Sequence, residues 1–362
     1  STYGFMSPAN PTTVNAIAQD LHRGVTWLAG DNGLYCYKNG QFVENELTEL
    51  CKKVRIRHVS VTSEGAVLVS TYEKLGQLKY NLDGTLESWT PANGLAGSRV
   101  RVAEQFSNGD IYVGTTSGLS IISPDGTITN ITKNEEIQND YIMCIHEDKD
   151  GSVWVGTDGG GIFVLKDKQV VKKITKDDNL SGNVIFKILN LRDDELWICT
   201  GTGLSIYKNN QIFSFSSVSG LGYDSVFQVI LDYTQKIWFT TNQGIFNLKL
   251  SEIDEVMAGT KNYVNPKFFT RQDGIDSGGV TSTSLSMKDN LGRIWFTLID
   301  GFTIFDPVRN ESNNSAPKIT IEDVLLDTEK IKLQDNKIVI PPAVKRLRIN
   351  YTGISFISPE QI

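Results

Sequence analysis

The chain has 362 residues, 40% of them hydrophobic, and a formal net charge of −7 at pH 7. This acidic balance argues against nucleic-acid binding, which favours a basic face. The sequence also shows no apolar run of about 20 residues that could span a membrane. Four cysteines are too few for a disulfide scaffold, and Cys144 and Cys199 lie among apolar neighbours, where we expect buried free thiols.

A short pattern recurs along the chain: a β-prone run with an aromatic residue, a tight turn, and a glycine followed by an apolar residue. The pattern repeats about every 42 residues, which is typical of a β-propeller with one four-stranded blade per repeat. The aromatic position is occupied in turn by Trp27, Leu68, Tyr112, Trp154, Trp197, Trp238 and Trp295. The copy at Leu68 is degenerate. The sequence therefore predicts an all-β fold, a seven-bladed β-propeller.

The fifth repeat shows how one blade is encoded. We expect its four strands, from the centre of the ring outward, at Val184–Asn190, Leu196–Thr200, Leu204–Tyr207 and Ile212–Phe215. The glycine before Leu204 is expected to adopt a positive φ. The Trp of each second strand is expected to fill the space between adjacent blades.

The two ends of the chain predict how the ring closes and where it ends. The last repeat supplies three strands, Ser282–Lys288, Arg293–Leu298 and Phe302–Asp306, and Tyr3–Met6 is expected to add the fourth. An insertion of about 15 residues, Ser251–Pro266, precedes the last blade. We assign residues 1–309 to the propeller, 310–317 to a linker, and 318–362 to the start of a second β-domain. Strands are expected there at Lys318–Leu326, Lys337–Pro341 and Arg346–Phe356.

Two segments carry a resemblance to a known family. The run from His146 to Thr157, preceded one blade earlier by Asn93-Gly-Leu95, resembles the regulator-propeller repeats of bacterial two-component sensors. The tail Leu347–Glu360 resembles the opening of the triple-tyrosine module, an immunoglobulin-like β-sandwich that follows such propellers.

This resemblance implies the periplasmic sensor region of a hybrid two-component receptor of the Bacteroides type. Ligands in that family are commonly oligosaccharides, and the receptors act as dimers. The kinase is not part of this sequence, so the chain is expected to bind and relay rather than catalyse. Any contact with the membrane is expected only through segments outside this sequence.

The sequence predicts no cofactor and no metal site, because its three histidines, His22, His58 and His146, lie in different repeats without ligand spacing. Asp148–Trp154 resembles the Asp-box of sialidases, which is a turn motif, and we interpret it as structural.

Ligand contacts are expected on one face of the ring, where the loops between blades meet the turns between second and third strands. Sugar recognition needs planar rings and groups that hydrogen-bond hydroxyls. The candidates on this face are Arg99, Tyr141, Asp158, Asn183, Tyr223, Asp224, Asp276 and Asp300. Among the loops, Thr270–Gly279 is the strongest candidate for a ligand-binding segment.

Two alternative functions stay open. One is a propeller glycoside hydrolase or polysaccharide lyase, for which no carboxylate pair can be placed, and the other is a protein-interaction scaffold.

Overall fold

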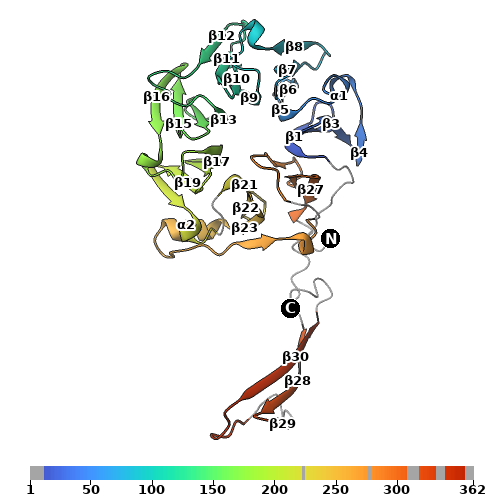
Figure 1. Ribbon diagram of the computed structural model, residues 1–362, viewed down its shortest axis with the longest axis vertical. Coiled ribbons are helices and arrows are strands. Elements are labelled where there is room, and N and C mark those ends of the chain that lie inside the picture. Colours follow the sequence, from blue (N-terminus) through green and yellow to red (C-terminus); the bar gives the residue numbers. More distant parts are fainter. Residues whose placement is uncertain (1–11, 222–224, 276–278, 308–317, 332–338, 355–362) are drawn as a thin grey trace.

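The computed structural model describes residues 12–221, 225–275, 279–307, 318–331 and 339–354. Antiparallel sheets form a ring, and each sheet corresponds to one sequence repeat (Figure 1). Within each sheet the strands follow chain order, with the first strand nearest the axis of the ring and the last at the rim. The all-β propeller fold predicted from the repeats is confirmed.

Six of the repeats fold as four-stranded sheets, which we call blades one to six. Blades one and two are β1 (Val14–Asp20), β2 (Val25–Gly30), β3 (Gly33–Lys38), β4 (Gln41–Val43), β5 (Ile56–Val61), β6 (Val67–Thr71), β7 (Gln77–Tyr80) and β8 (Leu86–Trp89). Blades three and four are β9 (Val100–Gln105), β10 (Ile111–Thr115), β11 (Gly118–Ile122), β12 (Ile128–Ile131), β13 (Ile142–Glu147), β14 (Val153–Thr157), β15 (Ile162–Lys166) and β16 (Gln169–Ile174). Blades five and six are β17 (Ile185–Arg192), β18 (Glu195–Thr200), β19 (Gly203–Lys208), β20 (Gln211–Phe215), β21 (Val226–Leu231), β22 (Lys236–Thr241), β23 (Gly244–Lys249) and β24 (Lys267–Phe269).

Two short helices interrupt the β-structure of the ring. The helix α1 (Glu46–Leu50) connects blade one to blade two, and α2 (Leu250–Met257) lies in the predicted insertion, between β23 and β24. Single 3-10 turns precede the first strands of four repeats. These are η1 (Pro91–Asn93), η2 (Lys176–Asp178), η3 (Ser217–Ser219) and η4 (Arg271–Asp273).

The seventh repeat folds as a three-stranded sheet of β25 (Met287–Lys288), β26 (Ile294–Leu298) and β27 (Gly301–Phe305). The prediction of a continuous strand at Ser282–Lys288 is wrong in its first part, because Thr283 has a φ of 56° and breaks the extended backbone there. The ring closes where Ala16 of β1 bridges Leu285, whose N–H donates to the carbonyl of Asn15 at 2.9 Å. The predicted closing strand Tyr3–Met6 lies outside the described residues.

Aromatic side chains fill the interfaces between blades, as predicted. The ring of Trp154 lies 5.0 Å from that of Tyr207 in blade five, and the ring of Trp295 lies 5.7 Å from that of Tyr37 in blade one. Several of these tryptophans are anchored by a buried carboxylate: the indole N–H of Trp27 donates to Asp20 at 2.9 Å. Trp238 and Trp295 are held in the same way by Asp232 and Asp289. This bond fixes the ring and satisfies its only polar group.

Glycines have two distinct roles in the blades. The glycines before the third strands adopt positive φ, as predicted, with 142° at Gly203. Gly156 in β14 does not adopt a positive φ. A glycine is needed there because Cys144 of the adjacent strand β13 and Ile185 of blade five both approach closely. A Cβ atom there would lie 2.5 Å from Sγ of Cys144 and 2.6 Å from Cγ2 of Ile185.

We therefore expect Gly156→Ala to lower the free energy of unfolding by about 1–3 kcal/mol, as overpacking of a core does. Gly201→Ala is the matched control, because its Cβ would make ordinary contacts, 3.4 Å from Cβ of Val184, and its φ is not positive. Urea denaturation of both variants measures the difference. Equal stabilities would show that the interface relaxes without cost.

Beyond the ring, β28 (Lys318–Leu326), β29 (Glu329–Ile331) and β30 (Leu347–Ile354) form a three-stranded sheet in the order β29-β28-β30 (Figure 1). The predicted strands at Lys318–Leu326 and Arg346–Phe356 are confirmed within the described range. Of the predicted strand Lys337–Pro341, residues 337 and 338 lie outside it, and the prediction is wrong for residues 339–341, which are in no strand. Among the described residues, no helix has the length and apolar character needed to cross a membrane.

Candidate functional site

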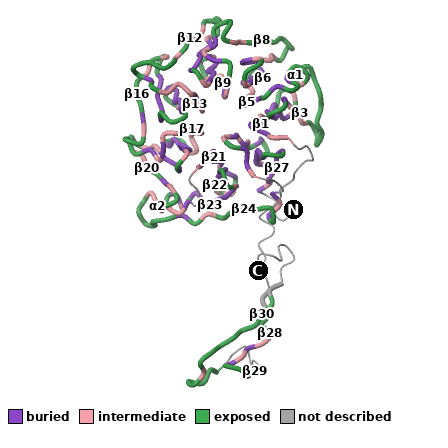
Figure 2. Tube along the Cα trace, in the orientation of Figure 1, coloured by how far each residue is buried: buried purple, intermediate pink, exposed green. Residues whose placement is uncertain are grey.

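The first strand of each four-stranded blade has a β-bulge near its beginning. In β5, for example, Ile56 pairs with Thr71 and His58 with Ser70, so Arg57 is the extra residue between them. The register shifts at the same place in the other five blades. We call the six extra residues the axial set: Asn15, Arg57, Arg101, Met143, Phe186 and Phe227. Their strands surround the axis of the ring (Figure 1), and four of the six are only half-buried (Figure 2).

One side of the axial set is polar and basic. Arg57 donates to Oδ1 of Asn15 at 3.3 Å and to Oγ1 of Thr283 at 2.7 Å. Arg101 donates to the same Thr283 hydroxyl at 3.1 Å and to the Tyr141 hydroxyl at 3.3 Å. Arg101 belongs to blade three and Thr283 to the seventh repeat, which are not neighbours in the ring. Their contact therefore places these side chains at the axis.

The other side of the axial set is apolar. Phe186 and Phe227 come from blades five and six, and their rings meet edge to face with centroids 5.3 Å apart. Met143 is the extra residue of blade four, which lies between blade three, with Arg101, and blade five, with Phe186. The axis thus offers aromatic and thioether surface beside two guanidinium groups, which is the mixture found where a ligand is bound by stacking and by hydrogen bonds.

A second layer of side chains comes from residues two positions before the axial set, just ahead of the first strands. Arg55 donates to Asp31 at 3.2 Å, and Arg99 donates to Glu73 at 2.7 Å. Both guanidinium groups also lie over the ring of Tyr72, at 4.9 and 5.5 Å from its centroid. These two arginines, unlike those of the axial set, are about half exposed and already have carboxylate partners.

Tyr141 connects the two layers. Its ring lies 5.6 Å from the guanidinium carbon of Arg101. Burial raises the pKa of Tyr141, and its hydrogen bond with Tyr72 acts in the same direction, while Arg101 opposes them. The phenol therefore stays protonated at neutral pH and can donate as well as accept a hydrogen bond.

The structure brings some of the predicted site residues together. Arg99 and Tyr141 lie in the layers just described. Asp158 and Asn183 are close by: the N–H of Asp158 donates to the carbonyl of Tyr141 at 3.0 Å, and the N–H of Gly159 to that of Asn183 at 3.2 Å. Asp300 is exposed in the turn between β26 and β27. Tyr223, Asp224 and Asp276 lie outside the described residues.

Sequence reasoning missed the axial residues themselves. It selected residues in the loops and turns, whereas Arg57 and Arg101 lie inside the first strands. One signal was present: Arg55-Ile-Arg57 recurs as Arg99-Val-Arg101 at the same place in the next repeat. Arginines repeated at the first strands, which lie nearest the axis of the ring (Figure 1), indicate that the centre of the ring is polar.

Two histidines, His58 and His146, lie in the first strands of blades two and four, the strands nearest the axis (Figure 1). His58 of blade two has no hydrogen-bond partner for Nδ1, and burial lowers its pKa to about 3, helped by the charges of Lys187 and Arg57. Lys187 comes from blade five, so its effect on His58 acts across the ring. His146 accepts or donates a 2.6 Å hydrogen bond with Asn190. Within the described ranges, no group of three or more His, Cys, Asp or Glu residues could hold a metal ion.

All four cysteines are buried free thiols, as was predicted for Cys144 and Cys199. Burial raises the pKa of Cys144 to about 12 and also raises that of Cys199. Both thiols therefore stay protonated at neutral pH and are poor nucleophiles.

A separate groove of about 550 Å³ lies at the rim between blades four and five. Lys172, Tyr207 and Phe213 are among the residues that line it. Its polar groups are paired with one another: Lys172 Nζ donates to the Tyr207 hydroxyl at 2.8 Å, and that hydroxyl donates to Asn210 at 2.8 Å. The axial site is the stronger candidate because it joins side chains from several blades and leaves Nε of Arg101 buried without a hydrogen-bond partner.

Comparisons with known proteins agree with the resemblance stated from sequence. Residues 136–159 match the two component regulator propeller family. Histidine kinase P4 of Formosa agariphila is 28% identical to this chain over 234 residues, which are 61% of this chain and 16% of that protein. The chain thus spans a small part of the length of this curated relative.

Solved structures confirm the propeller fold. The extracellular domain of a proposed hybrid two component system from B. thetaiotaomicron has a TM-score of 0.75 at 21% identity, over 96% of this chain and 48% of that one. A virginiamycin B lyase from Staphylococcus aureus has a TM-score of 0.63 at 18% identity, over 83% of this chain and 98% of the lyase. At these identities the similarity establishes a shared fold, which here is common to a sensor domain and an enzyme.

Proposed function

We propose that this chain is the ligand-binding part of an extracellular sensor in a hybrid two-component system, and that it binds an oligosaccharide at the ring axis. The observation that carries the proposal is the convergence of half-buried aromatic and guanidinium groups from separate blades on one axis, in a chain with a two component regulator propeller repeat. Stacking rings beside directional donors are what sugar recognition requires.

The remaining parts of the proposal follow from the similarity to two-component proteins. A periplasmic location, dimerisation in the full receptor, and relay to a cytoplasmic histidine kinase are proposed for the whole protein. Arg99, Tyr141, Asp158 and Asn183 are proposed as outer contacts to the ligand, with Tyr223, Asp224, Asp276 and Asp300 completing that face.

A thermal-shift screen against defined oligosaccharides, with product analysis of every hit, tests this proposal. A ligand that binds only the folded state stabilises it by about 2.7 kcal/mol at a hundredfold excess over its Kd. We expect a raised melting temperature with the sugar recovered intact. Cleavage of the sugar would favour the lyase or glycosidase alternative, and no shift with any sugar would contradict oligosaccharide binding.

A further inference from the structure

The charge at the ring axis is opposite to that of the whole chain. The protein carries a formal net charge of −7, yet Arg57 and Arg101 meet at the axis, and Lys187 faces the same region from blade five. In the part of the chain that the structure describes, none of the three forms an ion pair with a carboxylate. Glu104, further along β9, acts on Cys144 and His146. Asp31 acts on Arg57 through its charge, but its carboxylate accepts hydrogen bonds from Asn15 and Arg55 instead.

The two axial guanidinium groups are held only by neutral acceptors. Each has five N–H donors. Each donates to two side-chain oxygens, and both share the single hydroxyl of Thr283. Nε of Arg101 is buried without any hydrogen-bond partner. Thr283, which carries the shared hydroxyl, has a positive φ of 56°.

Such an arrangement costs free energy. Two like charges are held close together, and burying a charge without a counter-charge is unfavourable. Burial and the neighbouring charge of Arg101 lower the pKa of Arg57 to about 10, so it remains charged at neutral pH. Arg23, Arg192 and Arg293, in contrast, all pair with buried carboxylates. An oxyanion between Arg57 and Arg101 would satisfy the free donors and remove the repulsion, because guanidinium groups bind planar or tetrahedral oxyanions through paired hydrogen bonds.

We infer that the ligand of this site is an acidic sugar. Arg57 and Arg101 bind its carboxylate or sulfate group, and a neighbouring sugar ring packs on Phe186, which is half-buried and rests on the buried ring of Phe227. This inference rests on the proposed function and specifies its ligand: the two arginines select for charge, and Phe186 supplies the surface on which a pyranose ring stacks.

The test is calorimetric titration of the intact chain with two matched pairs of probes. Tetragalacturonate is paired with its methyl ester, and a sulfated galactose tetrasaccharide with its desulfated form. We expect at least one acidic probe to bind at least about tenfold more tightly than its neutral partner, as loss of a charged hydrogen bond predicts. Preference for the first pair assigns a carboxylate, and for the second a sulfate.

Variants then connect this preference to the axis. Arg101→Gln is expected to remove the preference for the acidic probe, and Arg101→Lys to restore part of it, because lysine keeps the charge but not the fork of donors. Arg348→Gln is the matched control, because Arg348 is an exposed arginine of β30, outside the ring (Figure 1); it should leave the preference in place. Melting temperatures without ligand show that each variant is folded.

The outcomes separate this inference from the proposed function. Equal binding of acidic and neutral probes, or an unchanged preference in Arg101→Gln, overturns the acidic-sugar inference and leaves oligosaccharide binding standing. Failure of every acidic probe to bind, while neutral sugars bind, overturns it in the same way. If no sugar binds, acidic or neutral, both the acidic-sugar inference and the proposed oligosaccharide binding are contradicted.

Discussion

Trp238→Ala is expected to lower the free energy of unfolding by about 3–5 kcal/mol, the usual cost of truncating a buried tryptophan. Trp238 is 1% exposed and lies at the interface between blade six and the seventh repeat. Its ring centroid is 4.8 Å from that of Phe269 in its own blade, and 5.5 and 4.4 Å from those of Phe296 and Phe305 across the interface. The substitution empties this space and removes the donor to Asp232.

Urea denaturation measures this loss, with Tyr263→Ala as the control because Tyr263 is an aromatic residue that is 67% exposed. A loss as small as that of the control would mean that the two blades close over the cavity. The total free energy of unfolding of a domain is about 5–15 kcal/mol, so the expected loss is a large fraction of the stability that keeps the ring closed.

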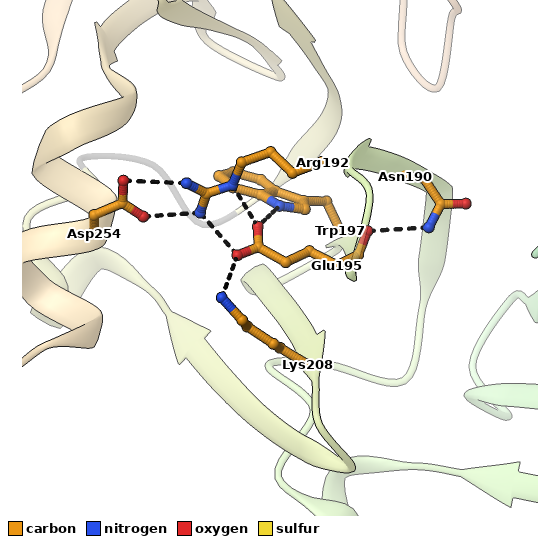
Figure 3. A network of polar contacts seen from close by, with 6 residues as sticks. All are labelled: Asn190, Arg192, Glu195, Trp197, Lys208 and Asp254. Carbon is orange, nitrogen blue, oxygen red and sulfur yellow. Dashed lines mark hydrogen bonds and ion pairs between the residues drawn. The ribbon is translucent and has the colours of Figure 1, made fainter. Parts of the chain in front are cut away.

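The second large effect is expected at Glu195, the centre of a polar network on blade five (Figure 3). The Glu195 side chain is 2% exposed and accepts hydrogen bonds from Trp197 at 2.9 Å, from Arg192 at 2.8 Å and from Lys208 at 3.3 Å. Arg192 also donates to Asp254, which attaches α2 to blade five at 2.8 Å.

Glu195→Ala is expected to cost about 2–4 kcal/mol, because it leaves a buried indole N–H and a partly buried guanidinium group without their acceptor. Asp254→Ala removes the other partner of Arg192, but this carboxylate is 51% exposed, and the loss should be at most about 1 kcal/mol. Denaturation of the two variants side by side provides the measurement. A larger loss for Asp254→Ala would show that docking of α2, rather than the buried carboxylate, stabilises this region.

The same network predicts a dependence on pH. Burial by itself raises the pKa of Glu195, but hydrogen bonds from Arg192, Trp197 and Lys208 outweigh it and hold the pKa below its ordinary value. A depressed pKa contributes stability above about pH 4.5, and this contribution disappears as the pH falls through the folded-state value. The stability difference between the wild type and Glu195→Ala should therefore shrink below about pH 4.

The repeats made the architecture predictable because each blade needs the same few residues at the same places. A large ring is needed between blades, as at Trp154, and a residue that tolerates positive φ is needed before the third strand, as at Gly203. These requirements are local and recur, so they can be read from the chain. Even the degenerate repeat folds as a blade, with Leu68 fully buried in the aromatic position.

The candidate site could be predicted only in part because it depends on features without a local signal. Nothing in Ile56-Arg57-His58 indicates that one residue is extra to the ladder, since a bulge depends on the partner strand as well. Thr283 is β-branched and lies in a strand-like run, so its positive φ runs against its intrinsic preference. Choosing exposed loop residues selected Arg99 and Tyr141 but not Arg101, whose guanidinium group donates a hydrogen bond to the Tyr141 hydroxyl.

The placement of the axial residues on bulges has an evolutionary consequence. A residue that is extra to the ladder has no direct cross-strand partner, so replacing it leaves the pairing register of its blade intact. The positions that we propose to meet the ligand are thus largely separate from those that specify the fold. A propeller built in this way can diversify its ligand, one blade at a time, while every blade retains the sequence pattern that makes it fold.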